Sequence, residues 1–200
     1  MDKLLKYKSM RDEKKTPEPF GSDSIDPRNL VFVVQKHSAT ALHYDFRLEV
    51  GGVMPSWAVP KGPSLDPTVK RLAMKTEDHP LDYRHFEGTI PEGEYGAGEV
   101  IIWDEGTYIG EKEVDKKRVN VKDKKEGERI IEEGIEKGEI KFFLNGKRLK
   151  GSFALVKTKG FPPGRTNAWL LIKHKDEFCK SGFDAGDFVQ SVVSDKKLDR

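Results

Sequence analysis

The chain has 200 residues, of which 36% are hydrophobic and 35% are charged, enough apolar material for one ordinary domain with charged flanks and loops. Lysine and arginine total 36 against 34 acidic residues, so a net charge of +2 excludes the overall basic character of a purely cationic DNA-binding protein. A nucleic-acid site would have to be a local basic patch. Cys179 is the only cysteine, which excludes an intramolecular disulfide and multi-cysteine zinc sites, and this fits a reducing cytoplasm.

The N-terminal region predicts an arm without a core of its own. Residues 1–10 have the pattern of a short amphipathic turn or helix, while residues 11–29 are polar and contain three prolines and a glycine. The opening residues contain no apolar run that suits a signal peptide, and no later run approaches a membrane span. We therefore expect a cytoplasmic protein without a membrane partner.

Short strands separated by turns are predicted from residue 31 to about residue 76. The run 31–34 is Val-Phe-Val-Val, the run 42–50 alternates polar and apolar residues, and Gly51-Gly52 predicts a hairpin turn. Further strands are expected at 53–59 and 71–76. The prolines and glycines between them interrupt strand pairing.

The second half of the chain predicts more strands and one helix. Residues 99–103 and 107–109 have the pattern of a hairpin that turns at Glu105-Gly106, and residues 122–137 that of a charged surface helix. Strands are expected at 140–144, 149–157 and 168–174, with a turn at Asn145-Gly146, followed by a polar tail over 176–200. This pattern predicts a mainly β fold, an antiparallel β-barrel with a few short flanking helices, and places Trp57, Trp103 and Trp169 in its core.

The run 42–50 carries the first chemically informative pattern. Strand alternation places His43, Asp45 and Arg47 on one face, opposite an apolar face. On pattern alone, a polar face that meets water is the more common outcome. However, a His-x-Asp pair offers two metal ligands, and His37, beyond an expected bend at 38–40, supplies a possible third.

A second polar face is predicted after the next turn. Arg71, Lys75, Glu77 and His79 share parity, and Arg71 and His79 are candidate donors to a phosphate. Lys61 lies in a Pro-Lys-Gly-Pro turn. On local grounds Lys61 is more often a solvated lysine, and Tyr83 a packing residue.

Two other functions remain open on these residues. A non-haem iron oxygenase uses two histidines and one carboxylate inside a β-barrel, although the surrounding cations favour a phosphate substrate. A non-catalytic DNA-end-binding adaptor would use Lys61 and Arg71 only for backbone contacts, although the complete set of metal ligands argues against it.

Five motifs resemble one known family. They are Phe32-Val-Val-Gln-Lys-His37, His43-Tyr-Asp45-Phe-Arg47-Leu-Glu49, Trp57-Ala-Val-Pro-Lys61-Gly62, Glu77-Asp-His79-Pro-Leu-Asp-Tyr83 and Pro91-Glu-Gly-Glu-Tyr-Gly. In this order they closely resemble the 3′-phosphoesterase domain of bacterial DNA ligase D and its stand-alone archaeal and bacterial relatives. The resemblance runs from about Arg11 to His174, and without a ligase or polymerase segment in the 200 residues we expect the stand-alone form.

The resemblance implies roles for thirteen residues. His37, His43 and Asp45 match the ligands of a divalent metal, expected to be manganese. A second group matches family residues that surround the substrate phosphate or are otherwise important for catalysis: Arg47, Lys61, Arg71, Glu77, His79 and Tyr83. Gln35 lies beside them. The stretch with Arg11, Asp12 and Glu18 matches, more loosely, a segment implicated in nucleotide removal.

The implied activity is processing of DNA 3′ ends. A diesterase step would remove a 3′-terminal ribonucleoside and leave a 3′-phosphate, and a monoesterase step would then expose the 3′-OH for end joining. The expected partners are primer-template 3′ ends and a separate ligase, polymerase or end-binding protein, in the nucleoid of a prokaryote. The expected organisation is an arm (1–29) packed on or near the active site, a barrel domain (30–175) and a tail (176–200).

Overall fold

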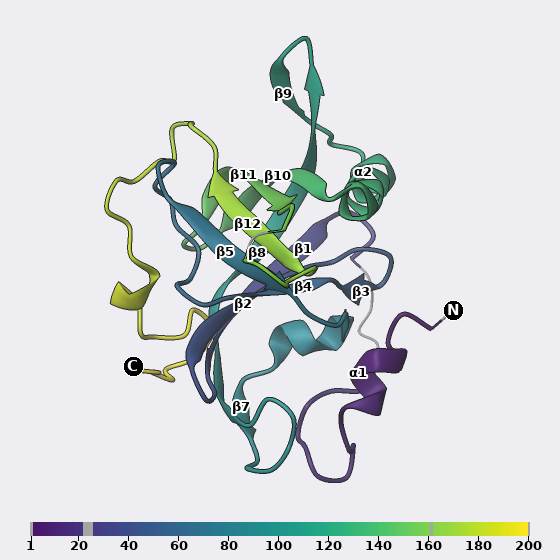
Figure 1. The fold of residues 1–200 in the computed structure, drawn as a ribbon, viewed down its shortest axis with the longest axis vertical. Helices are drawn as coiled ribbons and strands as arrows, with labels where there is room; N and C mark the ends of the chain where they lie inside the picture. Colours follow the sequence, from purple (N-terminus) through teal and green to yellow (C-terminus); the bar gives the residue numbers. More distant parts are fainter. Residues whose placement is uncertain (1, 22–25, 161, 200) are drawn as a thin grey trace.

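The computed structural model describes residues 2–21, 26–160 and 162–199, and its sheet closes on itself (Figure 1). Eight antiparallel strands follow one another in the order β1-β2-β4-β5-β12-β11-β10-β8, and β8 pairs with β1 to complete the ring. Closure leaves none of these strands without two neighbours, which removes exposed sheet edges from the barrel. The predicted antiparallel barrel is confirmed.

Short elements surround the barrel strands. The barrel consists of β1 (Leu30–Ser38), β2 (Leu42–Leu48), β4 (Ser56–Val59), β5 (Lys70–Lys75), β8 (Gly98–Val114), β10 (Glu139–Gly146), β11 (Lys150–Lys157) and β12 (Ala168–Lys173). Outside it lie β3 (Val53–Met54), which pairs with β6 (His79–Pro80), and β7 (Gly88–Ile90) and β9 (Lys117–Asn120), which pair with β8. The helical elements are α1 (Leu5–Ser9), η1 (Leu81–His85), α2 (Lys124–Lys137) and η2 (Ala185–Asp187).

Alternation along each strand fills the barrel interior with apolar side chains. On β2, Tyr44, Phe46 and Leu48 point inward and belong to the main core cluster. Their neighbours His43, Asp45 and Arg47 therefore point outward. The three tryptophans lie in the same interior cluster and are at most 2% exposed, as predicted.

A second, smaller apolar cluster lies on the outside of the barrel and explains why this outer face is covered. Val33 of β1 and Ile102 of β8 pack there against Met54 of β3 and Leu81 of η1. This cluster anchors η1 and the β3–β6 pair over the outward-facing side chains of β1 and β2. The polar face of β2 therefore does not simply meet water.

Helix α2 confirms the predicted charged helix and has clear boundaries. The side chain of Asp123 accepts a hydrogen bond from the backbone N–H of Glu126, and Gly138 ends the helix in the left-handed conformation at φ +86°. A partly buried ion pair of 3.0 Å between Lys124 and Glu49 attaches the helix to the residue that follows β2.

Two predicted turns need correction. Gly106 does not form a hairpin turn, because β8 runs unbroken through it. A Cβ there would lie 2.2 Å from the carbonyl oxygen of Asn145, so this glycine permits close strand approach. The β10–β11 hairpin exists, but its turn lies just beyond the predicted pair. Asn145 pairs with Lys150, and the carboxylate of Asp104 accepts N–H hydrogen bonds from residues 147–149.

Both termini pack against the barrel. Tyr7 of α1 is 1% exposed, and its ring contacts the rings of His79 and Tyr83. From the C-terminal tail, Phe183 and Ala185 enter the main core cluster. Of the predicted arm, residues 1 and 22–25 lie outside the described residues, as does residue 200 of the predicted tail.

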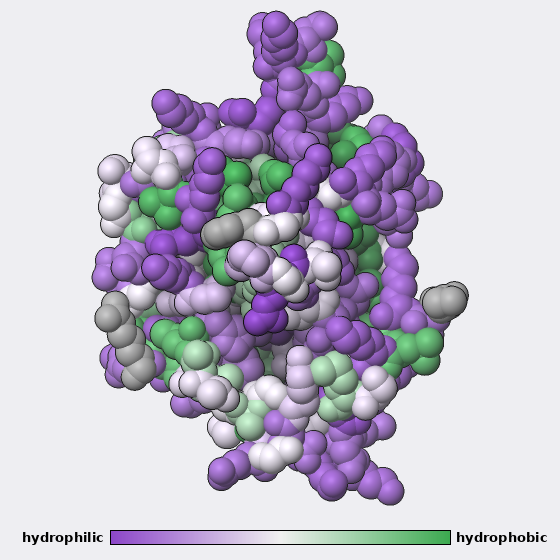
Figure 2. All heavy atoms as spheres, viewed as in Figure 1, coloured by the Kyte–Doolittle hydropathy of each residue, from purple (hydrophilic) through white to green (hydrophobic). Residues whose placement is uncertain are grey.

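The surface in Figure 2 is mainly hydrophilic, with apolar residues dispersed over it. The β8–β9 hairpin projects from the barrel, at the top of Figure 1. Within the described ranges no helix is both long and apolar enough to cross a membrane.

Candidate metal centre

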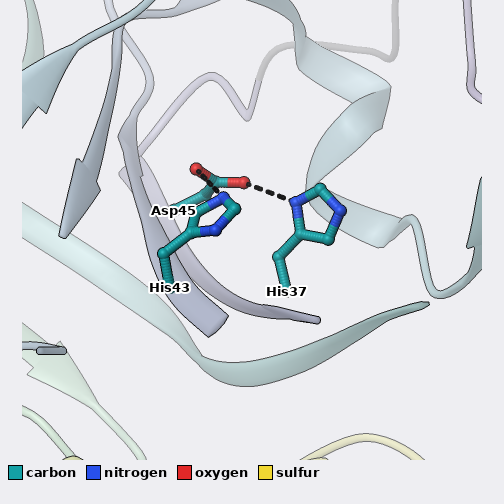
Figure 3. Close-up of side chains that lie close together, drawn as sticks. All are labelled: His37, His43 and Asp45. Atoms are coloured by element: carbon teal, nitrogen blue, oxygen red, sulfur yellow. Dashed lines mark ion pairs between the residues drawn. The ribbon is translucent and has the colours of Figure 1, made fainter. Parts of the chain in front are cut away.

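Two neighbouring strands place the three predicted ligands together. His37 near the end of β1 lies opposite His43 near the start of β2 in the antiparallel register, and Asp45 follows two residues later on the same outer face. Figure 3 shows the carboxylate of Asp45 beside both imidazole rings. Their ligand atoms all lie within 4.8 Å of one another, and in the described part of the chain no other group of His, Cys, Asp and Glu meets this criterion.

The distances within this cluster are too long for direct hydrogen bonds. Nδ1 of His37 lies 3.6 Å from one carboxylate oxygen of Asp45, and Nε2 of His43 lies 3.6 Å from the other. Three ligand atoms thus face a common centre without satisfying one another. This arrangement could bind a metal ion.

Backbone carbonyls fix which ring nitrogen each histidine offers. Nε2 of His37 lies 2.8 Å from the carbonyl oxygen of Gly96, and Nδ1 of His43 lies 2.9 Å from that of Ala41. Because a carbonyl only accepts, these nitrogens carry the protons in the neutral rings. The lone pairs therefore lie on Nδ1 of His37 and Nε2 of His43, the two atoms that face Asp45. Such outer hydrogen bonds are typical of histidine metal ligands.

Arg47 holds Asp45 in its charged form. Burial of Asp45 opposes ionisation, but the guanidinium of Arg47 lowers the pKa of the carboxyl well below its usual value. The Arg47 side chain is 3% exposed, and its Nη2 donates to Asp45 over 2.9 Å. A charged carboxylate is the form that binds a metal.

A buried network fixes Arg47 in turn. Its Nε donates to Gln35 Oε1 over 2.7 Å, and its Nη1 donates to Ser56 Oγ over 2.9 Å. The amide of Gln35 donates to the carbonyls of Tyr83 and Phe86, and its side chain is completely buried. Gln35 therefore lies behind Arg47 and orients it, and does not reach the cavity as a predicted substrate contact would.

The N-terminal arm contributes a second buried guanidinium. Nε of Arg11 lies 2.9 Å from Glu18, and its Nη1 lies 3.2 Å from Glu77. Glu18 also accepts hydrogen bonds from the hydroxyls of Thr16 and Tyr83, each over 2.8 Å. The arm is therefore fixed to the barrel by paired charges from which water is largely excluded.

His79 lies between the two arginines and is held as a neutral ring. Its Nδ1 lies 3.0 Å from the carbonyl oxygen of Glu77, so Nδ1 carries the proton, and Nε2 accepts from Nη2 of Arg11 at 3.4 Å. Burial, followed by the charges of Arg47 and Arg11, lowers the pKa of His79 well below its usual value. Burial likewise raises the pKa of the Tyr83 hydroxyl.

These side chains surround a cavity of about 300 Å³. Its lining includes all three candidate ligands together with Arg11, Arg47, Glu77, His79, Tyr83 and Tyr95. With neutral histidines, two arginines balance two carboxylates, so the charged lining sums to zero (2 − 2 = 0). A divalent cation would raise this sum to +2 and make the cavity attractive to a phosphate.

Three predicted site residues do not line this cavity. Arg71 pairs with Leu171 of β12. Ala73, two residues further along β5 and therefore on the same face as Arg71, belongs to the barrel core. Arg71 therefore shares the face opposite Asp45. Lys61 is exposed in the turn after β4. Asp12 is paired with Lys15 at 3.4 Å on the surface of the arm. Arg71 does not share a face with Glu77 and His79, because β5 ends at Lys75 and these two residues reach the cavity from the segment beyond it.

Sequence reasoning missed several residues of the site. Ser56 touches both Arg47 and His79, at 2.9 Å and 3.3 Å, yet a lone serine at the start of a strand gives no signal of this. The carbonyl groups of Ala41 and Gly96 belong to the backbone, so the residue types at these positions do not indicate their role. Tyr95 had a signal, since it lies within the Gly-Glu-Tyr-Gly run.

The fold and the site together define a class of protein. A closed antiparallel barrel carries a two-histidine, one-carboxylate cluster on its covered outer face, next to two buried arginines. This is the outline of a candidate metal centre for an anionic substrate.

Comparison with known proteins identifies the family. The profile of the DNA Ligase D 3′-phosphoesterase domain matches residues 35–157. The chain is 45% identical to the multifunctional non-homologous end joining protein LigD of Pseudomonas aeruginosa, over 98% of this chain and 22% of that protein. It is 44% identical to the multifunctional non-homologous end joining DNA repair protein LigD of Mycobacterium tuberculosis, over 96% and 22%. The chain therefore belongs to the DNA ligase D 3′-phosphoesterase domain family, and it spans about a fifth of the length of these relatives.

Proposed function

We propose that this chain is a manganese-dependent phosphoesterase that processes DNA 3′ ends for end joining. It would remove a 3′-terminal ribonucleoside by phosphodiesterase action and a 3′-phosphate by phosphomonoesterase action, leaving a 3′-OH. Family membership supports the reaction class. The observation that carries the metal requirement is the pair of histidines whose lone pairs, fixed by the carbonyls of Gly96 and Ala41, face Asp45.

His37, His43 and Asp45 would hold the metal, and their nitrogen and oxygen donors suit manganese among other divalent ions. When bound, such an ion polarises phosphoryl oxygens and lowers the pKa of water. All other contributions come from the protein. Arg47 and Arg11, buried and oriented, would offset charge on the phosphoryl oxygens.

His79 is the candidate for proton transfer. His79 lines the cavity and its Nε2 accepts from Nη2 of Arg11, so Nε2 would take a proton if Arg11 turned to an entering phosphate, whose negative charge would offset the charges of the arginines. The protonated ring would then donate to a phosphoryl or leaving oxygen. The pH profile of kcat for His79→Ala tests this role, since the profile should lose one ionisation relative to the unsubstituted protein.

A single assay tests the proposed function. A primer-template with a 3′-terminal ribonucleotide, and another with a 3′-phosphate, are incubated with the protein and manganese, with and without chelator. We expect both ends to become 3′-OH and the chelator to stop both conversions. Persistence of full conversion in chelator would overturn the metal requirement. A need for ferrous iron and oxygen would support the oxygenase alternative, and salt-sensitive binding without turnover would support the adaptor.

A further inference from the structure

Tyr95 is an aromatic side chain in an unusual position, at the mouth of the metal cavity and open to solvent. It lines the cavity, yet it is 46% exposed, whereas Tyr83 in the same lining is 2% exposed. Tyr95 is among the few large apolar or aromatic residues of the described chain that remain exposed. An open ring beside a phosphate site is the arrangement that stacks a nucleobase.

The loop that carries Tyr95 is fixed relative to the metal cluster. Within it, Glu94 donates its N–H to the carbonyl of Pro91 over 3.2 Å, and Ala97 donates to that of Glu94 over 3.1 Å. The carbonyl oxygen of Gly96, the residue after Tyr95, accepts a hydrogen bond from His37. The ring is therefore one residue away from a direct link to a candidate metal ligand.

The N-terminal arm meets Tyr95 across the cavity rim. The guanidinium of Arg11 lies 4.0 Å from the ring centre of Tyr7 and 5.2 Å from that of Tyr95. This contact closes one side of the cavity. At this side the Arg11 side chain is 4% exposed and the ring of Tyr95 borders the solvent, whereas at the other side the candidate ligand His43 is itself 23% exposed.

We propose that Tyr95 is the stacking platform for the base of the terminal nucleoside that leaves. This inference rests on the proposed function. A DNA strand that continues away from the reacting phosphate needs an open path, which the His43 side provides. The terminal nucleoside has no continuation, so it fits the side where Arg11 blocks onward passage and the ring of Tyr95 is exposed. Each stacked base contributes on the order of ten- to a hundredfold in binding.

The test compares three primer ends on one enzyme. They carry a terminal ribonucleotide, a terminal abasic ribose, or a 3′-phosphate. Relative to the unsubstituted protein, Tyr95→Ala should raise KM for the ribonucleotide end about ten- to a hundredfold. It should also abolish the preference for a terminal nucleoside with a base over an abasic ribose. The increase in KM for the phosphate end should be at least five times smaller than the increase for the ribonucleotide end. Tyr95→Phe, which keeps the ring, should restore the preference. Val119→Ala, at an exposed residue of the β8–β9 hairpin, is the matched surface control.

The outcomes separate this inference from the proposed function. If the unsubstituted protein converts neither the ribonucleotide end nor the phosphate end, the proposed function fails. If it converts both, and Tyr95→Ala raises KM equally for the ribonucleotide, abasic and phosphate ends, the platform does not bind the leaving base and the inference is overturned. Loss of the base preference in Val119→Ala would also overturn it.

Discussion

Two clusters on this barrel combine histidine and carboxylate side chains, and they differ in what the lone pairs of these groups face. In the second cluster, Ser152 lies 2.5 Å from Glu111 and 2.8 Å from Nδ1 of His174. In the metal cluster, the histidine nitrogens lie 3.6 Å from Asp45 and make their hydrogen bonds outward, to backbone carbonyls. The groups of the second cluster hydrogen-bond to one another, whereas the three candidate ligands of the first lie within 4.8 Å of one another without a hydrogen bond between them. Chemical identity alone does not separate the two, but the direction of the lone pairs does.

Removing a histidine from each cluster gives the largest expected contrast. His43→Ala should reduce 3′-end conversion by roughly a thousandfold or more, because a catalytic metal supplies several kcal/mol of transition-state stabilisation. His174→Ala should leave turnover near that of the unsubstituted protein. The measurement is kcat/KM on both primer ends in manganese, with metal binding followed by calorimetry. Equal losses in the two variants would show that the distinction between the clusters is wrong.

Removing the residues that position Arg47 should have the next largest effect on turnover. Gln35→Leu removes the oxygen that receives Nε of Arg47, so we expect kcat/KM to fall about 10- to 100-fold through misplacement of the guanidinium. Metal affinity should change less than turnover, because the Gln35 side chain bonds to Arg47 and to the carbonyls of Tyr83 and Phe86 and not to the three candidate ligands in the described structure. Ser56→Ala, which removes another partner of Arg47, should act in the same direction. A loss confined to metal affinity would contradict this role.

A smaller effect is expected from the backbone that orients His37. Gly98 has φ +145°, and a Cβ there would lie 2.2 Å from the carbonyl oxygen of Ser38. Gly98→Ala should therefore displace the loop that carries the Gly96 carbonyl and weaken metal binding about tenfold. Gly93→Ala is the matched control, since Gly93 also has positive φ but no atom within 4 Å of an added Cβ. If both variants weaken metal binding equally, strain alone explains the effect.

The cluster of Ser152, Glu111 and His174 should affect the pH dependence of the free energy of unfolding. Burial, followed by the charge of Arg118, lowers the pKa of His174 to about 4. Between pH 6.5 and pH 4 the unfolded chain binds a proton that the folded chain does not, so this residue makes the protein less stable as pH falls. The slope for one proton is at most about 1.4 kcal/mol per pH unit, and less here because the ring is only half-buried. Denaturant unfolding of His174→Asn should therefore depend less on pH in this window, and an unchanged slope would refute the shift.

The sequence predicted the architecture where local patterns decide it. Alternation along residues 42–50 correctly divided β2 into a core face and an outer face that carries His43 and Asp45, and Gly51 and Gly52 both adopt positive φ at the predicted turn. Gly106 misled the prediction, because a glycine that allows close strand approach has the same letter as one in a turn. Local pattern contains no record of which distant backbone lies beside a residue.

The candidate site was predictable to the extent that its residues lie on one pair of neighbouring strands. His37, His43 and Asp45 come together through one strand pair, so parity and spacing suffice. Parity failed for Arg71, because the chain leaves β5 at Lys75 before it reaches Glu77. The contacts between Arg11, Glu18 and Tyr83 depend on how the arm docks, which no periodicity encodes.

The opposite orientation of the two imidazoles has a practical consequence for redesign. His37 presents Nδ1, the nitrogen close to the backbone, and His43 presents Nε2, the distant one. The side-chain amide of asparagine occupies roughly the place of Nδ1, and that of glutamine roughly the place of Nε2. Asparagine is therefore the nearest isostere at residue 37 and glutamine at residue 43, so one replacement chemistry applied to both positions would place a donor correctly at only one.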